Sequence, residues 1–178
     1  MKRAFSLFLR AASTDGIIFI VLLVGALLFF MMLIPQHSPS PQKTCQSNQK
    51  QIATAFMLYA QEHEGKFPPA AGWDTAIDVK GKILNCPANK ESEWSYAYNK
   101  NLVDVNIDKI EDAGHLPLTA DSTESKAIMD KTKDIAFRHK GKEDMLAILS
   151  FVDGHVTYMQ KSALKNVIFE HAPKNNGK

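Results

Sequence analysis

The longest apolar run in the chain, residues 16–34, contains nineteen residues and no charge. Fourteen of the nineteen are isoleucine, leucine, valine or phenylalanine, so the run is apolar on every face of a helix. A helix of this length spans about 30 Å, the hydrocarbon thickness of a bilayer. These side chains favour insertion by about 4–8 kcal/mol. The pattern therefore predicts a transmembrane helix over residues 16–34.

A cleaved secretory signal is the alternative interpretation of this run. Signal cores contain about 7–15 apolar residues and end at a small-residue cleavage site. This run closes instead with Met-Met-Leu-Ile-Pro-Gln, which favours a retained anchor. Lys2, Arg3 and Arg10 precede the run, and only Lys43 lies close behind it. The positive-inside rule predicts a cytoplasmic tail over residues 1–15 and an exported C-terminal portion.

Two different patterns follow the anchor. Residues 35–43 (PQHSPSPQK) contain three prolines, which favours an extended linker. Residues 44–64 then carry apolar and aromatic positions at helical spacing, which predicts an amphipathic helix. Its apolar stripe contains Ile52, Phe56, Tyr59 and His63. Its solvent side is expected to contain Gln46, Asn48, Lys50 and Glu62.

Strand-like patterns replace helical spacing further along the chain. Residues 94–98 alternate, with Trp94, Tyr96 and Tyr98 on one face, where they are expected in the core. Residues 115–120 form a second candidate strand that ends at Asp121.

The strongest local pattern is a hairpin near the C-terminus. Residues 146–152 and 155–159 are strand-like and flank Asp153-Gly154. That dipeptide is typical of two-residue turns in which both residues have φ > 0. Such a turn would pair Val152 with His155.

Together these elements predict an α+β fold. A transmembrane helix precedes an amphipathic helix, which packs on a small antiparallel sheet. The exported domain is expected over residues 44–170, with a short helix over 161–169 near its end. Residues 171–178 are expected to be a disordered tail.

Composition narrows the classes of function. The formal net charge of +2 gives no signal for nucleic-acid binding. The sequence has no phosphate-binding glycine loop, no HExxH and no Gly-x-Ser-x-Gly. We therefore expect neither an enzyme nor a bound cofactor.

The two cysteines, Cys45 and Cys86, leave two alternatives open. In an oxidising compartment they are expected to form a disulfide closing a loop of about 42 residues. In a reducing compartment they would remain free thiols.

His139, Asp153 and His155 invite a metal-site interpretation. A zinc site needs three or four convergent ligands, and no spacing brings Asp121, His115 or Cys86 to these residues. An exported zinc hydrolase is therefore a minor alternative. The preferred roles are a turn for Asp153 and Gly154, and for His139 a hydrogen bond that holds the preceding loop.

Several segments, in order, resemble bacterial type II secretion pseudopilin-like proteins of the wider type IV pilin group. They are Cys-Gln-Ser-Asn-Gln from Cys45, Gly-Lys-Phe-Pro-Pro from Gly65, Asn-Cys-Pro from Asn85, Leu-Thr-Ala-Asp from Leu118, Arg-His-Lys-Gly from Arg138 and Phe-Val-Asp-Gly-His from Phe151. The resemblance covers residues 44–159 and implies a pilin-like fold. It also implies that His139 and the Asp153-Gly154 pair form the C-terminal His…Asp-Gly motif of the family.

The resemblance implies a structural or accessory subunit of a type II secretion or type IV pilus-like assembly in the bacterial inner membrane. Its expected partners are the lipid bilayer and other pilin-like or secretion subunits. Self-association through the transmembrane helix would use the small residues Gly16, Gly25 and Ala26.

The N-terminus departs from the prepilin pattern. Val21 stands where that family carries a glutamate, and a proline-rich linker interrupts what is usually one helix. Both departures favour an alternative, a membrane-tethered extracytoplasmic binding module outside any filament.

Overall fold

The computed structural model describes residues 14–33, 39–90, 94–122, 128–129 and 131–170. The chain divides into two units, Met1–Ser38 and Pro39–Lys178, and each is described by itself. Of the expected N-terminal tail, residues 1–13 lie outside the described residues. So do residues 34–38, from the end of the anchor into the linker, and the tail 171–178.

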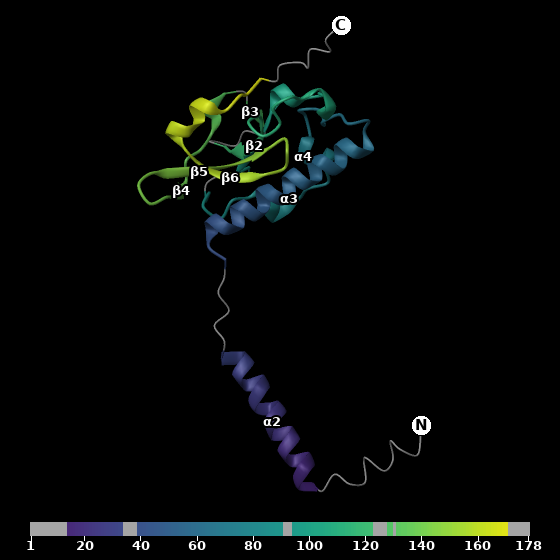
Figure 1. Ribbon diagram of the computed structural model, residues 1–178, viewed down its shortest axis with the longest axis vertical. Coiled ribbons are helices and arrows are strands. Elements are labelled where there is room, and N and C mark those ends of the chain that lie inside the picture. The colour runs from purple at the N-terminus through teal and green to yellow at the C-terminus, as the bar shows by residue number, and fades with distance from the viewer. Residues whose placement is uncertain (1–13, 34–38, 91–93, 123–127, 130, 171–178) are drawn as a thin grey trace. The chain divides into compact units, whose positions relative to one another are not determined.

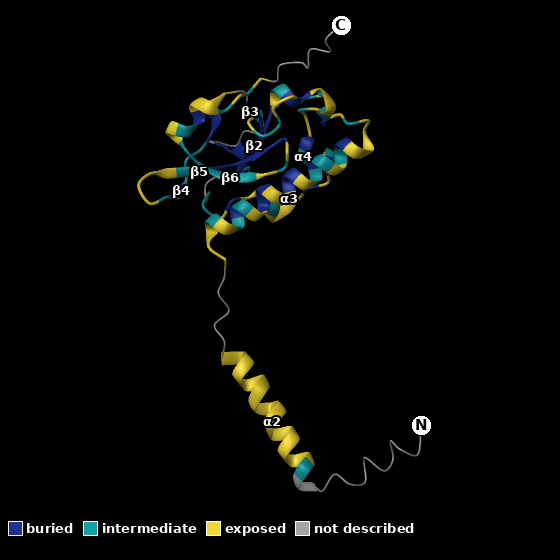
Figure 2. Ribbon diagram, viewed as in Figure 1, coloured by how far each residue is buried: buried dark blue, intermediate teal, exposed yellow. Residues whose placement is uncertain are grey.

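The described part of the first unit is one helix, α2 (Thr14–Leu33). Residues 17–33 are exposed on every side of this helix, whereas α3 alternates between buried and exposed positions (Figure 2). The window Gly16–Leu33 has a mean hydropathy of 3.0, so α2 is long and apolar enough to cross a membrane. A signal sequence near an N-terminus has the same properties.

Helix α3 (Pro41–Glu62) opens the second unit. It begins three residues earlier than the predicted Thr44, within the expected linker. The cause is local: the Ser40 side chain accepts a hydrogen bond from the Lys43 amide, and Pro41 occupies the first helical position. The predicted stripe is buried at Ile52 and Phe56 but becomes exposed at His63, beyond the end of the helix.

A six-stranded sheet packs against α3 (Figure 1). Its strand order is β3-β1-β2-β5-β4, with β6 also paired to β5. The expected antiparallel arrangement holds for every pair but one, because β1 and β3 run parallel, so the sheet is mixed. The strands are β1 (Tyr96–Asn99), β2 (Pro117–Asp121), β3 (Ile128–Met129), β4 (His139–Lys140), β5 (Met145–Phe151) and β6 (Val156–Gln160).

Short helices make up much of the remaining connections. They are α4 (Trp73–Ala76) and the 3₁₀ turns η1 (Gly81–Leu84), η2 (Lys100–Leu102), η3 (Ile107–Lys109), η4 (Thr132–Asp134) and η5 (Lys161–Asn166). The expected terminal helix over 161–169 is therefore the 3₁₀ turn η5.

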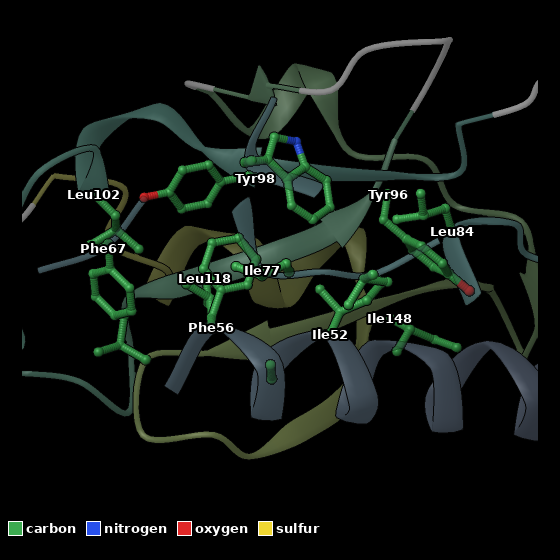
Figure 3. Packing of buried hydrophobic residues seen from close by; sticks show 14 of the residues in the cluster. Ile52, Phe56, Phe67, Ile77, Leu84, Tyr96, Tyr98, Leu102, Leu118 and Ile148 are labelled. Atoms are coloured by element: carbon green, nitrogen blue, oxygen red, sulfur yellow. The ribbon is translucent and has the colours of Figure 1, made fainter. Parts of the chain in front are cut away.

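Alternating side chains give the sheet two buried faces. The face toward α3 carries Tyr96, Tyr98 and Ile148, which pack with Ile52 and Phe56 of the helix (Figure 3). The opposite face contains Ala97, Ala120, Met129, Ala147, Leu149 and Phe151, which pack with Leu164 of η5. The predicted inward alternation of Tyr96 and Tyr98 is confirmed, since both are fully buried in the α3 cluster.

Strand β5 is central and has an interrupted edge. Strand β6 pairs with it from Leu146 to Ser150, so β6 occupies one edge. Strand β2 pairs at Leu149 and Ser150, and β4 pairs at Leu146, so both lie along the other edge. Between them, at Ile148, that edge has no strand partner within the described part of the chain.

Candidate functional site

The two cysteines are joined in a disulfide. Cys45 lies in α3 and Cys86 follows η1, with their Cα atoms 5.0 Å apart and a sequence separation of 41. Of the two alternatives that the sequence left open, the structure has the disulfide. A loop of this length stabilises a fold by about 4 kcal/mol in the chain-entropy model. The bond therefore fixes the start of α3 to the irregular segment before β1.

A histidine–aspartate pair fills the interrupted edge of β5. Asp121 ends β2, and its Oδ2 accepts the Ile148 amide at 2.8 Å. The same oxygen lies 3.1 Å from Nε2 of His139, the first residue of β4. A buried strand amide without a partner is costly, so the Asp121 carboxylate takes the place of a missing strand here. His139 thus lies in close polar contact with the end of β2, and this contact holds its segment against that strand.

The pair and the disulfide form one cluster. Nε2 of His139 lies 3.6 Å from Sγ of Cys86 as well as facing Asp121. We call Cys45, Cys86, Asp121 and His139 the Cys–His–Asp cluster. At most 2% of each residue is exposed. No spacing in the sequence predicts that these residues come together.

A cationic side chain, Arg138, contacts the residue that follows Asp121. Its Nη2 donates to the Ser122 carbonyl, next to Asp121. Among the described residues, Oδ1 of Asp121 and Nε and Nη1 of Arg138 are buried and have no hydrogen-bond partner. Burial raises the pKa of the nearby Tyr96 hydroxyl, and the Asp121 charge raises it further. Tyr96 is therefore neutral.

This arrangement does not suit catalysis in the form described. A disulfide sulfur is not a nucleophile. In addition, the same ring nitrogen of His139, Nε2, faces both Asp121 and Cys86, so a proton cannot pass from Cys86 through the imidazole ring to Asp121. Two shallow surface cavities, of about 370 and 350 Å³, contain no residue of the cluster. The cluster holds three strands and a helix together in a dry interior.

The expected His…Asp-Gly motif does not converge. His139 pairs with Leu146 at the start of β5, whereas Asp153 and Gly154 follow the end of that strand. Asp153 instead pairs with His155, whose Nδ1 lies 2.6 Å from the aspartate Oδ1. The pair at His139 is thus buried and separate from the exposed pair at the hairpin.

The hairpin turn differs from the two-residue turn predicted. The Phe151 amide donates to the His155 carbonyl, and the Gly154 amide donates to the Phe151 carbonyl. Three residues therefore form the turn, and Val152 does not pair with His155. Of the three, only Gly154 has a positive φ, of 83°. A type I turn followed by one left-handed residue satisfies the strand twist and needs one glycine rather than two left-handed positions.

A second buried polar group joins α3 to the sheet. Gln49 donates to the Ile148 carbonyl at 3.2 Å and accepts from the Thr119 hydroxyl, which lies 2.6 Å from Oγ of Ser150. Asn48, expected on the solvent side, is 6% exposed and donates to the Asn85 carbonyl. The burial of Gln49 could have been predicted from its position in the sequence. It lies one helical turn from both Cys45 and Ile52, on the same face of α3.

Of the three predicted packing residues of α2, Gly16 is half-buried, whereas Gly25 and Ala26 have open surroundings. A Cβ at Gly25 would meet no atom within 4 Å, and Ala26 is exposed. The helix surface is therefore free for lipid or another helix.

Comparison with known proteins found no matching family model, no matching curated protein and no matching solved structure.

Proposed function

We propose that this chain is a single-pass membrane protein whose exported α+β domain is a structural or accessory subunit of a pseudopilin-like assembly. The observation that carries the proposal is the order of the two helices. A helix exposed and apolar on every side, α2, precedes a helix that buries one stripe on a sheet, α3. This order and the sequence resemblance over residues 44–159 support a pilin-like architecture.

The chemistry of α2 supports lateral association in a membrane. In lipid, helices associate through close van der Waals contact, which small residues permit. Gly25 and Ala26 are adjacent small residues in the middle of α2, and neither is covered. The cations before the anchor favour a cytoplasmic N-terminus, and the buried disulfide suits an exported, oxidising location.

Photo-crosslinking in intact membranes tests this function. A benzophenone amino acid at Ala26 should give adducts with a second copy or with pilin-like or secretion subunits. The same probe at Leu58, an exposed position of α3, tests whether the domain also contacts them. A probe at the fully buried Phe56 is the matched control and should give no intermolecular adduct. Monomer alone at both exposed positions contradicts the proposal.

Val21 and the proline-rich linker favour the second candidate, a tethered binding module that does not enter a filament. The intact mass of the membrane-extracted chain distinguishes the two. A chain beginning at Ile17 has been processed like a prepilin, whereas a chain beginning at Met1 fits the tethered module.

A further inference from the structure

The Cys–His–Asp cluster gathers the ligand types of a closed zinc site. One donor atom from each of Cys45, Cys86 and His139 lies within 4.8 Å of the others. The Asp121 carboxylate lies 3.1 Å from the same His139 nitrogen. Zinc binds cysteine thiolate, histidine nitrogen and carboxylate oxygen, and its structural sites are four-coordinate and tetrahedral. The four side chains come from separate segments and converge only in the fold.

Two edges of a zinc tetrahedron are already in place. With Zn–S near 2.3 Å and Zn–N near 2.0–2.1 Å, the sulfur and nitrogen of a tetrahedral site lie about 3.6 Å apart. The Cys86 sulfur and the His139 Nε2 are 3.6 Å apart. Nitrogen and oxygen ligands would be about 3.3 Å apart, against 3.1 Å for His139 and Asp121. The two sulfurs must separate, which reduction of their bond allows, and the Asp121 carboxylate, which is not among the donor atoms within 4.8 Å of one another, must move toward them.

Burial and charge fit the same ion. The cluster is closed to solvent, as structural rather than catalytic zinc sites are. Oδ1 of Asp121 is buried and without a hydrogen-bond partner among the described residues. Two thiolates would add two negative charges, and one Zn²⁺ restores neutrality.

We propose that the reduced chain binds one Zn²⁺ through Cys45, Cys86, His139 and Asp121, so that disulfide and zinc are alternative closures of the same cluster. A phosphine reductant and one water convert the disulfide into two thiols and the phosphine oxide. Zinc then displaces one proton from each thiol, and the His139 nitrogen must be unprotonated. This proposal is independent of the proposed assembly function, which is tested by crosslinking.

The test uses the full chain in detergent. Because the disulfide is buried, the chain is unfolded in guanidinium, reduced with tris(2-carboxyethyl)phosphine and refolded without oxygen in the presence of ZnCl₂. Metal retained after gel filtration is measured by mass spectrometry. We expect about one zinc per reduced chain and none in the oxidised chain.

Variants show whether zinc binds at the Cys–His–Asp cluster or at another histidine. Cys86→Ser and His139→Ala should lose zinc, and Asp121→Asn should weaken binding by about 10–100-fold. His155→Ala is the matched control, because this histidine pairs with Asp153 outside the cluster, and it should bind like the parent chain. Zinc retained equally by His139→Ala, or lost in His155→Ala, overturns the proposal.

Cobalt substitution of the unmutated chain avoids variants that fail to fold. Co²⁺ in the proposed site should give the intense visible absorption of a four-coordinate ion and a thiolate charge-transfer band. A weak six-coordinate spectrum overturns the proposal. So does a reduced chain that neither retains zinc nor refolds with it.

Discussion

Strand β5 has a histidine–aspartate pair near each end, and the two pairs differ in surroundings more than in distance. Asp121 and His139 are 3.1 Å apart, with side chains 0% and 1% exposed. Asp153 and His155 are closer, at 2.6 Å, but over 40% of each side chain is exposed. Water and salt weaken the second interaction, whereas removing one partner of the first leaves a polar group in a dry interior. Contact distance is therefore a poor guide to what each pair contributes.

The two pairs also differ in what they connect. Asp153 and His155 are two residues apart, so their contact orders one turn. Asp121 joins the end of β2 to His139 of β4 and to the Ile148 amide of β5. Only the buried pair links segments that are distant in sequence, and only it depends on the complete sheet.

The largest difference is expected between alanine substitutions of the two aspartates. Asp121→Ala leaves His139 and the Ile148 amide without their buried acceptor and should lower the free energy of unfolding by about 3–5 kcal/mol. Asp153→Ala should cost less than about 1 kcal/mol. Guanidinium unfolding of the detergent-solubilised chain measures both, because its two tryptophans, Trp73 and Trp94, lie in the domain. Equal losses would contradict the comparison.

Of the two pairs, the disulfide contacts only the buried one, Asp121 and His139, so its contribution to stability should be coupled to that of this pair. Cys45→Ser with Cys86→Ser should cost about 4 kcal/mol from the lost loop constraint. Combined with Asp121→Ala, the loss should differ from the sum of the parts by at least about 0.5 kcal/mol, because the side chains share contacts. Combined with Asp153→Ala, the losses should add. The same unfolding measurement on the cysteine variant, the two aspartate variants and the two combinations decides this.

Substitution of the glycines in the turns before and after β5, Gly141 and Gly154, should lower stability for different reasons. A Cβ at Gly141, after β4, would overlap the Asp144 carbonyl oxygen and press on Leu146. Gly141→Ala should therefore cost about 1–3 kcal/mol. Gly154 has open space but a φ of 83°, so Gly154→Ala should cost about 1–2 kcal/mol. Gly154→Asn is the discriminating control: asparagine tolerates this φ and should recover part of the loss, whereas Gly141→Asn should recover none.

The smallest expected effect is the pH dependence of the exposed pair. Desolvation acts to raise the pKa of Asp153, but hydrogen bonds from the His155 backbone and side chain outweigh it, so the pKa is lowered from 3.8. Because the pKa of Asp153 is lower in the folded state, the carboxylate adds stability at pH values above its unfolded-state pKa. This stability is lost as the pH falls through its folded-state pKa. The parent chain should exceed Asp153→Asn by less than about 1 kcal/mol at pH 6. This difference in the free energy of unfolding should shrink below pH 3.8. A difference that grows in acid would contradict the lowered pKa of Asp153.

Sequence periodicity predicted the elements better than their contacts. The stripe through Ile52 and Phe56 and the alternation of Tyr96 and Tyr98 report burial directly, and the structure confirms them. Pairing of β1 with the two-residue β3 was not predictable, because a strand that short has no period. Nor was the turn, since Asp-Gly suits both a two-residue turn and the three-residue turn found.

The candidate site lay beyond sequence reasoning for a related reason. Asp121 and His139 each have an ordinary local role as the end of a strand, and only sheet order places them together with Cys86. Gln49 had a positional signal on the buried stripe, but polar residues usually face solvent. Such buried polar groups break the simple pattern because their partners come from elsewhere in the chain.

The position of the cysteines along the chain sets an order of events. Both precede β1, β2, β4 and β5, the strands that supply and position His139 and Asp121. During synthesis the two sulfurs therefore emerge while nothing yet covers them, and an oxidising enzyme can reach them only in that interval. Once the later strands have folded over the two cysteines, the oxidation state of their sulfurs cannot change until the domain unfolds. Each mature molecule therefore keeps the oxidation state that was set in the compartment in which its first half emerged.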